Sequence, residues 1–219
     1  MTDTQSRLAT RTITLLSTSV GKPAFLGMRR GEEVISGIRK KPVDAPAFEV
    51  TTLNIAGDGQ ADLVNHGGVN KAIYSYPAQH LVHWRETLGY QGDGIHALMG
   101  ENLSLAGIDE TTACIGDIWR WGDVILQISQ PRWPCYKLDM LTGIKGMMTK
   151  LIKSGYSGWY FRVLEPGTAP ASGEIEIVER DPLGITVLEA FNARRDPKLD
   201  PDEYARIMSH PKLAEAWNR

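Results

Sequence analysis

Residues 117–129 read Asp-Ile-Trp-Arg-Trp-Gly-Asp-Val-Ile-Leu-Gln-Ile-Ser, two short apolar runs joined by a Gly-Asp pair. Val124, Leu126 and Ile128 alternate along the second run, so they fall on one face of an extended strand. Gly122 and Asp123 supply the tight turn that a two-residue hairpin loop needs. We therefore predict an antiparallel β-hairpin over these residues.

Other short apolar runs, bounded by turn residues, flank the hairpin on both sides. They predict strands over residues 13–20, 48–55, 158–164 and 173–178. Many short strands at this spacing are typical of an antiparallel barrel or sandwich. The predicted fold class is therefore mainly β, with added helices.

Two stretches inside this β-rich part predict helices, residues 77–88 and residues 140–154. The first opens with Pro77, which is tolerated at the first position of a helix. The second is weakened by Gly143 and Gly146, because glycine in a helix interior is destabilising.

The remaining tail changes in composition and predicts three short helices. Thr186 and Glu189 stand three residues apart beside an apolar run, which is the pattern of a capping box. Two more short helices are predicted within residues 201–218. We therefore divide the chain into a barrel domain, residues 1–180, and a C-terminal three-helix segment, residues 181–219.

The composition excludes several classes of protein. The 219 residues include 24 Lys and Arg against 26 Asp and Glu, and this near balance argues against broad nucleic-acid binding. No apolar run approaches the length of a membrane span. The polar start, Met1 to Arg7, lacks the pattern of an export signal, so a cytoplasmic location is expected, with Cys114 and Cys135 as free thiols.

The most informative stretch for chemistry is Ser-Gln-Pro-Arg-Trp-Pro-Cys-Tyr-Lys-Leu at residues 129–138. Its two prolines stiffen the loop, and Cys135 stands between Arg132 and Lys137. Nearby cations stabilise a thiolate, the form that attacks electrophiles and binds metals. The alternative is that Cys135 is a small buried hydrophobe. Cys114 has apolar neighbours, and we expect it to be inert packing.

A second candidate cluster is Asn-His-Gly-Gly-Val-Asn-Lys at residues 65–71. Gly67 and Gly68 allow the backbone to approach a ligand closely or to adopt a positive φ. His66 and Lys71 place a tunable donor and a fixed cation around that bend, which suits a phosphate or another oxyanion. The alternative is a sharp turn with an exposed histidine.

Weaker patterns complete the search. Glu101 and Asn102 offer a carboxylate and an amide directly after a glycine. His80 and His83 have a spacing that can bind zinc from one helix face, but we expect one packed and one solvated histidine instead. No CxxC, HExxH, Walker, GxGxxG or GxSxG pattern occurs, so the usual zinc, protease, P-loop, Rossmann and serine-hydrolase sites have no support.

Taken together, these motifs resemble the MOSC domain family, the molybdenum-cofactor-sulfurase C-terminal domain. The resemblance covers nearly the whole chain and rests on His66-Gly-Gly with residues 71–77, on Gly100-Glu-Asn-Leu103, on Gly116-Asp117 and on Gln130-Pro-Arg-Trp-Pro-Cys-Tyr-Lys137. The combination of the first and last motifs is far more specific than either half. Their order is similar to the stand-alone YiiM-like branch, in which a three-helix segment follows the barrel.

The resemblance implies a MOSC-type β-barrel whose mouth holds a molybdopterin-type molybdenum cofactor. Cys135, and not Cys114, is then the catalytic molybdenum ligand. The YiiM-like branch is associated with detoxification of N-hydroxylated bases such as 6-hydroxylaminopurine, by reduction of N–OH to the amine. The basic side chains of the site would hold the phosphate or an oxyanion, while the carboxylate and the amide would shape the pocket. The implied cofactor-binding residues are His66, Gly67, Gly68, Lys71, Glu101, Asn102, Arg132 and Lys137.

This interpretation also implies partners. No flavin or iron–sulfur motif is visible, so we expect a separate electron-donating reductase, with no nucleic-acid polymer and no membrane as partner. A homodimer is the default oligomeric state. Three other interpretations stay open: a carrier of the cofactor or its sulfur, a metal-free enzyme with Cys135 as nucleophile and His66 as base, and a small-molecule-binding barrel without chemistry.

Overall fold

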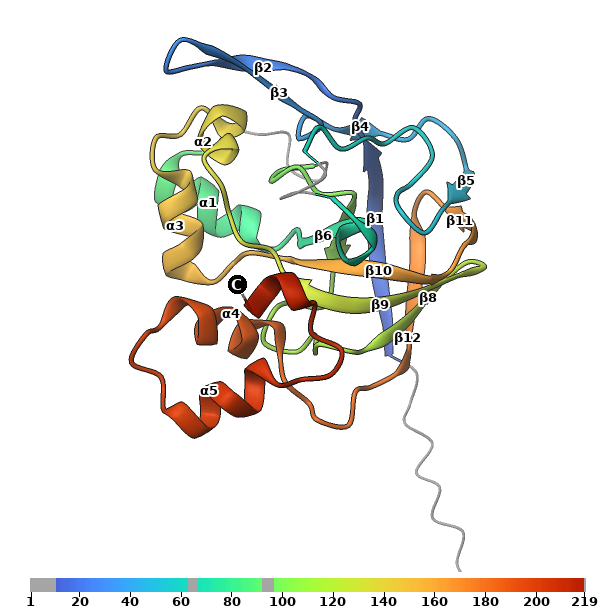
Figure 1. Cartoon of the computed structure of the whole chain (residues 1–219). Helices are drawn as coiled ribbons and strands as arrows, with labels where there is room; N and C mark the ends of the chain where they lie inside the picture. Colours follow the sequence, from blue (N-terminus) through green and yellow to red (C-terminus); the bar gives the residue numbers. More distant parts are fainter. Residues whose placement is uncertain (1–10, 63–66, 92–96, 219) are drawn as a thin grey trace, which may run out of the picture.

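The computed structural model describes residues 11–62, 67–91 and 97–218, and seven strands close into a barrel (Figure 1). The strand β12 pairs with β1 as well as with β8, which closes the sheet, and among the described strands only β6 and β7 pair in parallel. The prediction of a mainly β barrel with added helices is confirmed. Neighbouring strands follow the order β12 (Gly173–Glu179), β8 (Ile118–Trp121), β9 (Val124–Pro131), β10 (Trp159–Glu165), β6 (Ile73–Pro77), β7 (Leu103–Ala106) and β1 (Arg11–Val20).

The predicted hairpin is β8 and β9, with Trp121 opposite Val124 across the turn. Gly122 has a φ of 60°, and a Cβ there would lie 2.7 Å from a backbone oxygen, so the turn requires glycine. The three apolar side chains of β9 that were predicted to share a face are fully buried in the barrel. The strands predicted over residues 13–20, 158–164 and 173–178 are confirmed as β1, β10 and β12.

The short outer strands were less predictable. A hairpin of β2 (Ala24–Arg29) and β3 (Glu32–Ser36) stands at the edge of the barrel in Figure 1, and β4 (Lys41–Pro42) pairs with the end of β1. The strand predicted over residues 48–55 is wrong in length, because β5 (Ala47–Val50) ends where the Thr51 N–H donates to the Asn54 carbonyl and turns the chain back. Its partner, β11 (Gly167–Pro170), was not predicted.

The helices inside the β-rich part begin later or are shorter than predicted. The helix α1 (His80–Leu88) starts after Pro77, because Pro77 is the last residue of β6 and pairs with β7. The single helix predicted over residues 140–154 is in fact two helices. They are α2 (Lys137–Thr142) and α3 (Met147–Ser154), separated where Gly143 and Gly146 both adopt left-handed φ angles.

The tail forms α4 (Val187–Arg195), α5 (Pro201–Met208) and a final 3₁₀ turn, η2 (Glu215–Asn218). The capping box is confirmed, since Thr186 and Glu189 each accept a hydrogen bond from the backbone N–H of the other. Phe191 and Trp217 are buried in the same apolar cluster as the barrel interior, so the tail packs directly on the barrel. The division of the chain at residue 180 stays a prediction.

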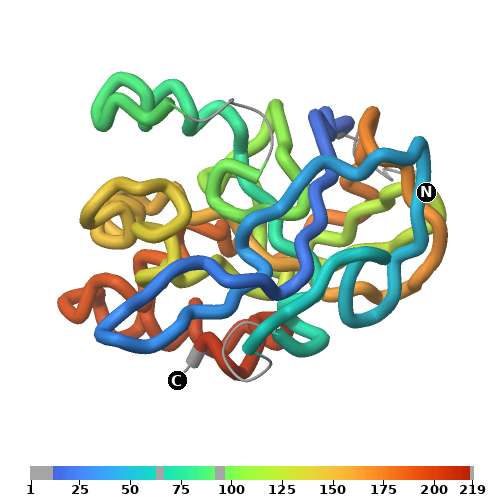
Figure 2. Tube along the Cα trace, turned by 90° about the horizontal axis from the view of Figure 1, so that it is seen from above, coloured from blue at the N-terminus to red at the C-terminus, as the bar shows by residue number. Residues whose placement is uncertain are grey.

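In both views the five helices gather on one side of the barrel (Figures 1 and 2). A second, smaller apolar cluster lies there, built from α1, α2, α3 and the outward tyrosines of β6. Among the described residues, no helix is long and apolar enough to cross a membrane. This side of the barrel also carries the loop that contains Cys135.

Candidate functional site

Cys135 lies in a short loop between the end of β9 at Pro131 and the start of α2. It is half-buried and not part of a disulfide, and it lines a hollow that is open to solvent. We call this hollow, which is bounded among others by Lys71, Asn102, Arg132 and Cys135, the cysteine pocket. A cysteine that only fills the hydrophobic core would have no solvent-open cavity beside it. Cys135 therefore does not fit the alternative of a small buried hydrophobe.

One row of neighbouring backbone groups brings the pocket residues together. Tyr160 of β10 lies opposite Gln130 of β9 on one side and opposite Tyr74 of β6 on the other. The row continues because the Asn102 N–H donates to the Tyr74 carbonyl at 2.7 Å, and the Ser19 N–H donates to the Asn102 carbonyl at 2.7 Å. Segments far apart in sequence therefore deliver side chains to the same end of the barrel.

Arg132 is the central cation of the pocket and is buried. Its Nη1 donates to the Tyr74 hydroxyl at 3.2 Å, and its guanidinium carbon lies 4.6 Å from the centre of the Tyr74 ring. Burial acts to lower the pKa of Arg132, but Tyr74, Tyr160 and Cys135 outweigh it and raise the pKa above its ordinary value. No carboxylate of the described residues forms an ion pair with Arg132.

The two tyrosines beside Arg132 were not singled out from the sequence. Their ring centres lie 5.3 Å apart, and the Tyr74 hydroxyl donates to the Ser157 carbonyl at 2.9 Å. Burial raises the pKa of both Tyr74 and Tyr160, although Arg132 acts in the opposite direction. They therefore stay neutral and support the guanidinium through hydrogen bonds and ring faces.

A second charged group in the pocket, also missed from the sequence, is the ion pair of Lys40 and Asp58. Asp58 is held further by the Gly21 N–H at 2.8 Å and by the Asn102 Nδ2 at 2.9 Å, both of which donate to its carboxylate. Burial lowers the pKa of Lys40, and the Asp58 charge opposes that shift. The Gly57-Asp-Gly59 turn was a weak signal for Asp58, but nothing in the sequence marked Lys40.

The predicted basic residues Lys71 and Lys137 both line the cysteine pocket. Burial lowers the pKa of Lys71, and the nearby charge of Arg194 adds to this shift. Gly68 precedes a 3₁₀ turn, η1 (Val69–Lys71), and has a φ of 91°, which is the positive φ that the paired glycines predicted. Gly67 and Gly68 are described but are not among the lining residues, and His66 lies outside the described residues.

Of the predicted pair Glu101 and Asn102, only the second lines the pocket. Asn102 lines the pocket, and its Nδ2 donates to the Ser19 carbonyl at 3.1 Å. Glu101 is fully buried and is not a lining residue, because its carboxylate accepts from the Leu98 N–H at 3.0 Å and the Met99 N–H at 2.8 Å. Glu101 thus fixes the turn before Asn102 and does not shape the pocket wall itself.

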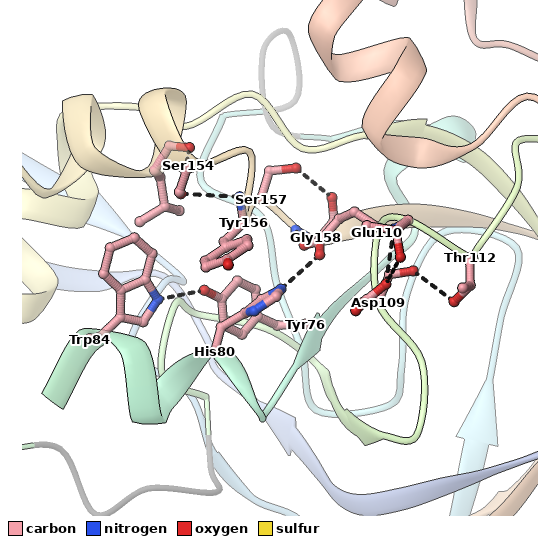
Figure 3. Close-up of polar contacts among 12 residues, drawn as sticks. Tyr76, His80, Trp84, Asp109, Glu110, Thr112, Ser154, Tyr156, Ser157 and Gly158 are labelled. Atoms are coloured by element: carbon pink, nitrogen blue, oxygen red, sulfur yellow. Dashed lines mark hydrogen bonds and ion pairs between the residues drawn. The ribbon is translucent and has the colours of Figure 1, made fainter. Parts of the chain in front are cut away.

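The remaining candidates take structural places. Cys114 is buried, and burial raises the pKa of its thiol to about 11, as inert packing predicts. His80 is buried and its Nε2 lies 2.7 Å from Glu110, whose other oxygen accepts from the Gly158 N–H at 2.7 Å (Figure 3). His83 is only half-buried. No group of three metal-ligating side chains occurs within the described ranges.

The comparisons with known proteins agree with this architecture. The family model described as "MOSC domain" matches residues 62–179. An "Uncharacterized protein YflK" from Bacillus subtilis (strain 168) is 40% identical over 203 residues, which cover 93% of this chain and 90% of that protein. "Protein YiiM" from Escherichia coli (strain K12) is 36% identical over 185 residues, or 84% of this chain and 82% of that protein.

A solved structure and a longer relative extend this likeness. The crystal structure of YiiM from Geobacillus stearothermophilus superposes with a TM-score of 0.76 at 30% identity, covering 94% of this chain and 95% of that one. A "Reductase" from Gibberella moniliformis (strain M3125 / FGSC 7600) is 34% identical over 152 residues, which are 68% of this chain but 27% of that protein.

Proposed function

The chain belongs to the MOSC domain family, and from this premise we propose that the cysteine pocket holds a molybdenum cofactor and reduces N-hydroxylated bases such as 6-hydroxylaminopurine to amines. The observation that carries the proposal is a pocket-lining thiol beside a buried arginine. Arg132 has no carboxylate partner among the described residues, and it interacts electrostatically with Cys135. A buried cation without a counter-charge favours a thiolate or a bound anion next to it.

The residues of the pocket fit this cofactor. A cysteine thiolate is a soft ligand suited to a transition metal, so Cys135 would hold the molybdenum. Lys71, Arg132 and Lys137 face the same hollow, and their charges suit the phosphate of the pterin. Asn102 adds a lining amide. In this proposal His66, Gly67 and Gly68 also bind the phosphate.

When bound, the cofactor supplies the two electrons that convert R–NHOH and two protons into R–NH₂ and water. The chain's own side chains hold the charges and protons of this reaction. In this proposal Arg132 stabilises the thiolate form of Cys135, and Tyr74 holds the guanidinium in place through its hydroxyl. The Lys40 ammonium lines the pocket, and because burial lowers its pKa, its Nζ can release a proton to the departing hydroxyl more readily than an ordinary lysine.

The electrons come from another protein in this proposal. The relative named "Reductase" matches this chain over 27% of its own length, so that name describes a much longer protein. A separate reductase would deliver electrons to the chain described here. Neither Cys114 nor Cys135 is in a disulfide, which is consistent with the proposed cytoplasmic location, because thiols stay reduced there.

The test compares Cys135→Ser with Cys114→Ser in a host that makes molybdopterin. Elemental analysis measures molybdenum per chain, and a turnover assay follows 6-hydroxylaminopurine with an artificial electron donor. We expect Cys135→Ser to stay folded and to lose both molybdenum and turnover, while Cys114→Ser keeps both. Full activity of Cys135→Ser would overturn the assignment, and bound molybdenum without turnover under any donor would indicate a carrier.

A further inference from the structure

Trp133, in the middle of the cysteine loop (residues 132–136), points at the C-terminal segment (residues 187–218). Its indole stacks on Phe191, with ring centres 5.2 Å apart and planes 29° apart. Trp217 meets the same indole edge-on at 6.0 Å. The guanidinium carbon of Arg194 lies 4.9 Å from the centres of both indoles. Three side chains of the segment therefore hold one side chain of the loop.

Main-chain contacts strengthen this attachment on both sides. The Ala214 N–H donates to the Ser129 carbonyl at 2.9 Å, just before the loop begins. Trp217 is itself fixed to α4, because its Nε1 donates to the Ala190 carbonyl at 3.1 Å. The C-terminal segment thus contacts both the end of β9 and the loop that follows it.

The same segment acts on a second pocket residue. The charge of Arg194 is, after burial, the main cause that lowers the pKa of Lys71. Lys71 lines the cysteine pocket from an element unrelated to the loop, η1. Arg194, which packs on Trp133, is therefore also close enough to Lys71 for its like charge to act on that lysine.

These contacts matter for the pocket because Trp133 stands between two of its residues in the sequence. Arg132 precedes it directly, and Cys135 follows two residues later. The loop has no helix or strand of its own, so beyond its prolines and the bond from the Arg132 N–H to the Gly158 carbonyl at 3.1 Å, its conformation depends on what its side chains touch. A shift of the loop backbone that takes the indole out of its contacts would also displace the neighbouring guanidinium and thiol, and functional groups lose efficiency when displaced by about 1 Å.

We propose that the C-terminal segment sets the geometry of the cysteine loop through Trp133, which is a positioning residue that keeps Cys135 beside Arg132. The proposal rests on the proposed function only in taking Cys135 as the working thiol. In this proposal the C-terminal segment positions residues of the pocket, in addition to covering apolar surface of the barrel.

The test measures alkylation of Cys135 by iodoacetamide as a function of pH in the cofactor-free full-length protein, with mass spectrometry of the labelled peptides. Trp133→Leu removes the stacked ring, and Phe191→Leu removes its partner on the tail. Trp133→Phe keeps an aromatic ring in the loop. Phe48→Leu is the matched control, since Phe48 packs on Trp121 and takes no part in the loop contacts.

We expect the pH midpoint of Cys135 alkylation to rise by about half a unit or more in Trp133→Leu and Phe191→Leu, or about three-fold slower labelling below the midpoint. Trp133→Phe should return toward the wild-type midpoint, and Phe48→Leu should match it even where its melting temperature falls. A wild-type midpoint in a folded but less stable Trp133→Leu or Phe191→Leu would overturn the proposal. If Trp133→Leu is insoluble, Phe191→Leu decides. The assay uses neither cofactor nor substrate, so its outcome is separate from that of the proposed function.

Discussion

Replacing Arg132 by methionine is expected to cost the metal-free protein little stability while removing the cation beside Cys135. Burying an ion carries a desolvation penalty of several kcal/mol. The Tyr74 ring at 4.6 Å recovers about 2 kcal/mol of that penalty, and the hydroxyl bond at 3.2 Å recovers about as much. These contributions nearly cancel, so we expect a net change in stability within about 1 kcal/mol.

The matched control is Arg162→Met, because the Arg162 side chain makes three hydrogen bonds, one from each of its nitrogens. Its Nε donates to Asn70 at 2.8 Å, its Nη1 to Gln127 at 2.9 Å and its Nη2 to the Lys212 carbonyl at 2.9 Å. Losing these bonds should cost about 2 kcal/mol or more. The same chemical change is thus predicted to cost little stability at Arg132 and more at Arg162.

Thermal unfolding of the cofactor-free protein measures both effects. For a chain of this size about 1 kcal/mol corresponds to about 2–4 °C, so Arg132→Met should melt within about 4 °C of the wild type and Arg162→Met at least about 4 °C lower. Alkylation of Cys135 near neutral pH should slow in Arg132→Met, because the thiolate loses its cation. A melting temperature for Arg132→Met that falls as far as that of Arg162→Met would refute the near cancellation of the desolvation penalty by the Tyr74 contacts.

Three further predictions follow from single contacts. Burial raises the pKa of the Cys114 thiol from 9.0 to about 11, so the folded state keeps this proton to a higher pH than the unfolded state. The free energy of unfolding should therefore fall as the pH rises from 9 to about 11. Cys114→Ala should make that fall smaller, as urea titrations at pH 9 and about pH 11 would measure. Lys40→Met leaves the Asp58 carboxylate buried without its cation and should lower the free energy of unfolding by about 3–5 kcal/mol. Adding Asp58→Asn should restore part of that free energy, as a double-mutant cycle in urea would detect. Gly158→Ala places a Cβ 2.2 Å from the Ser75 carbonyl at a φ of 65° and should lower the melting temperature by more than 10 °C or prevent soluble expression, and an unchanged melting curve would contradict this geometry.

The elements that could be predicted from the sequence are those with a local cause. The hairpin of β8 and β9 follows from alternating apolar residues around Gly122, and the start of α4 follows from the reciprocal bonds of Thr186 and Glu189. The failures have non-local causes. Pro77 begins a helix by its local preference, but pairing with Leu105 of β7 places it in a strand. A pattern of local preferences cannot show such a partner.

The same distinction separates the predictable part of the site from the rest. Arg132 and Cys135 stand in one loop, so a motif brings them together in the sequence itself. Lys40 and Asp58 have no such motif and reach the pocket only because the chain folds back around the end of β1. Glu101 has the right chemistry in the right motif, but its hydrogen bonds to Leu98 and Met99 turn it away from the cavity.

The barrel explains why so dispersed a site can still be well defined. Gln130, Tyr160, Tyr74, Asn102 and Ser19 form one row of hydrogen-bonded neighbours from β9 to β1, and closure of the sheet fixes the register of every member. A slip of one residue in any strand would turn its side chain to the opposite face, so the pocket depends on the register of the whole barrel and not on one loop. The loop that holds the thiol leaves this row at its β9 end, where the strand ladder no longer supports it. That is where the C-terminal segment attaches, and the barrel and the tail therefore fix successive parts of the same site.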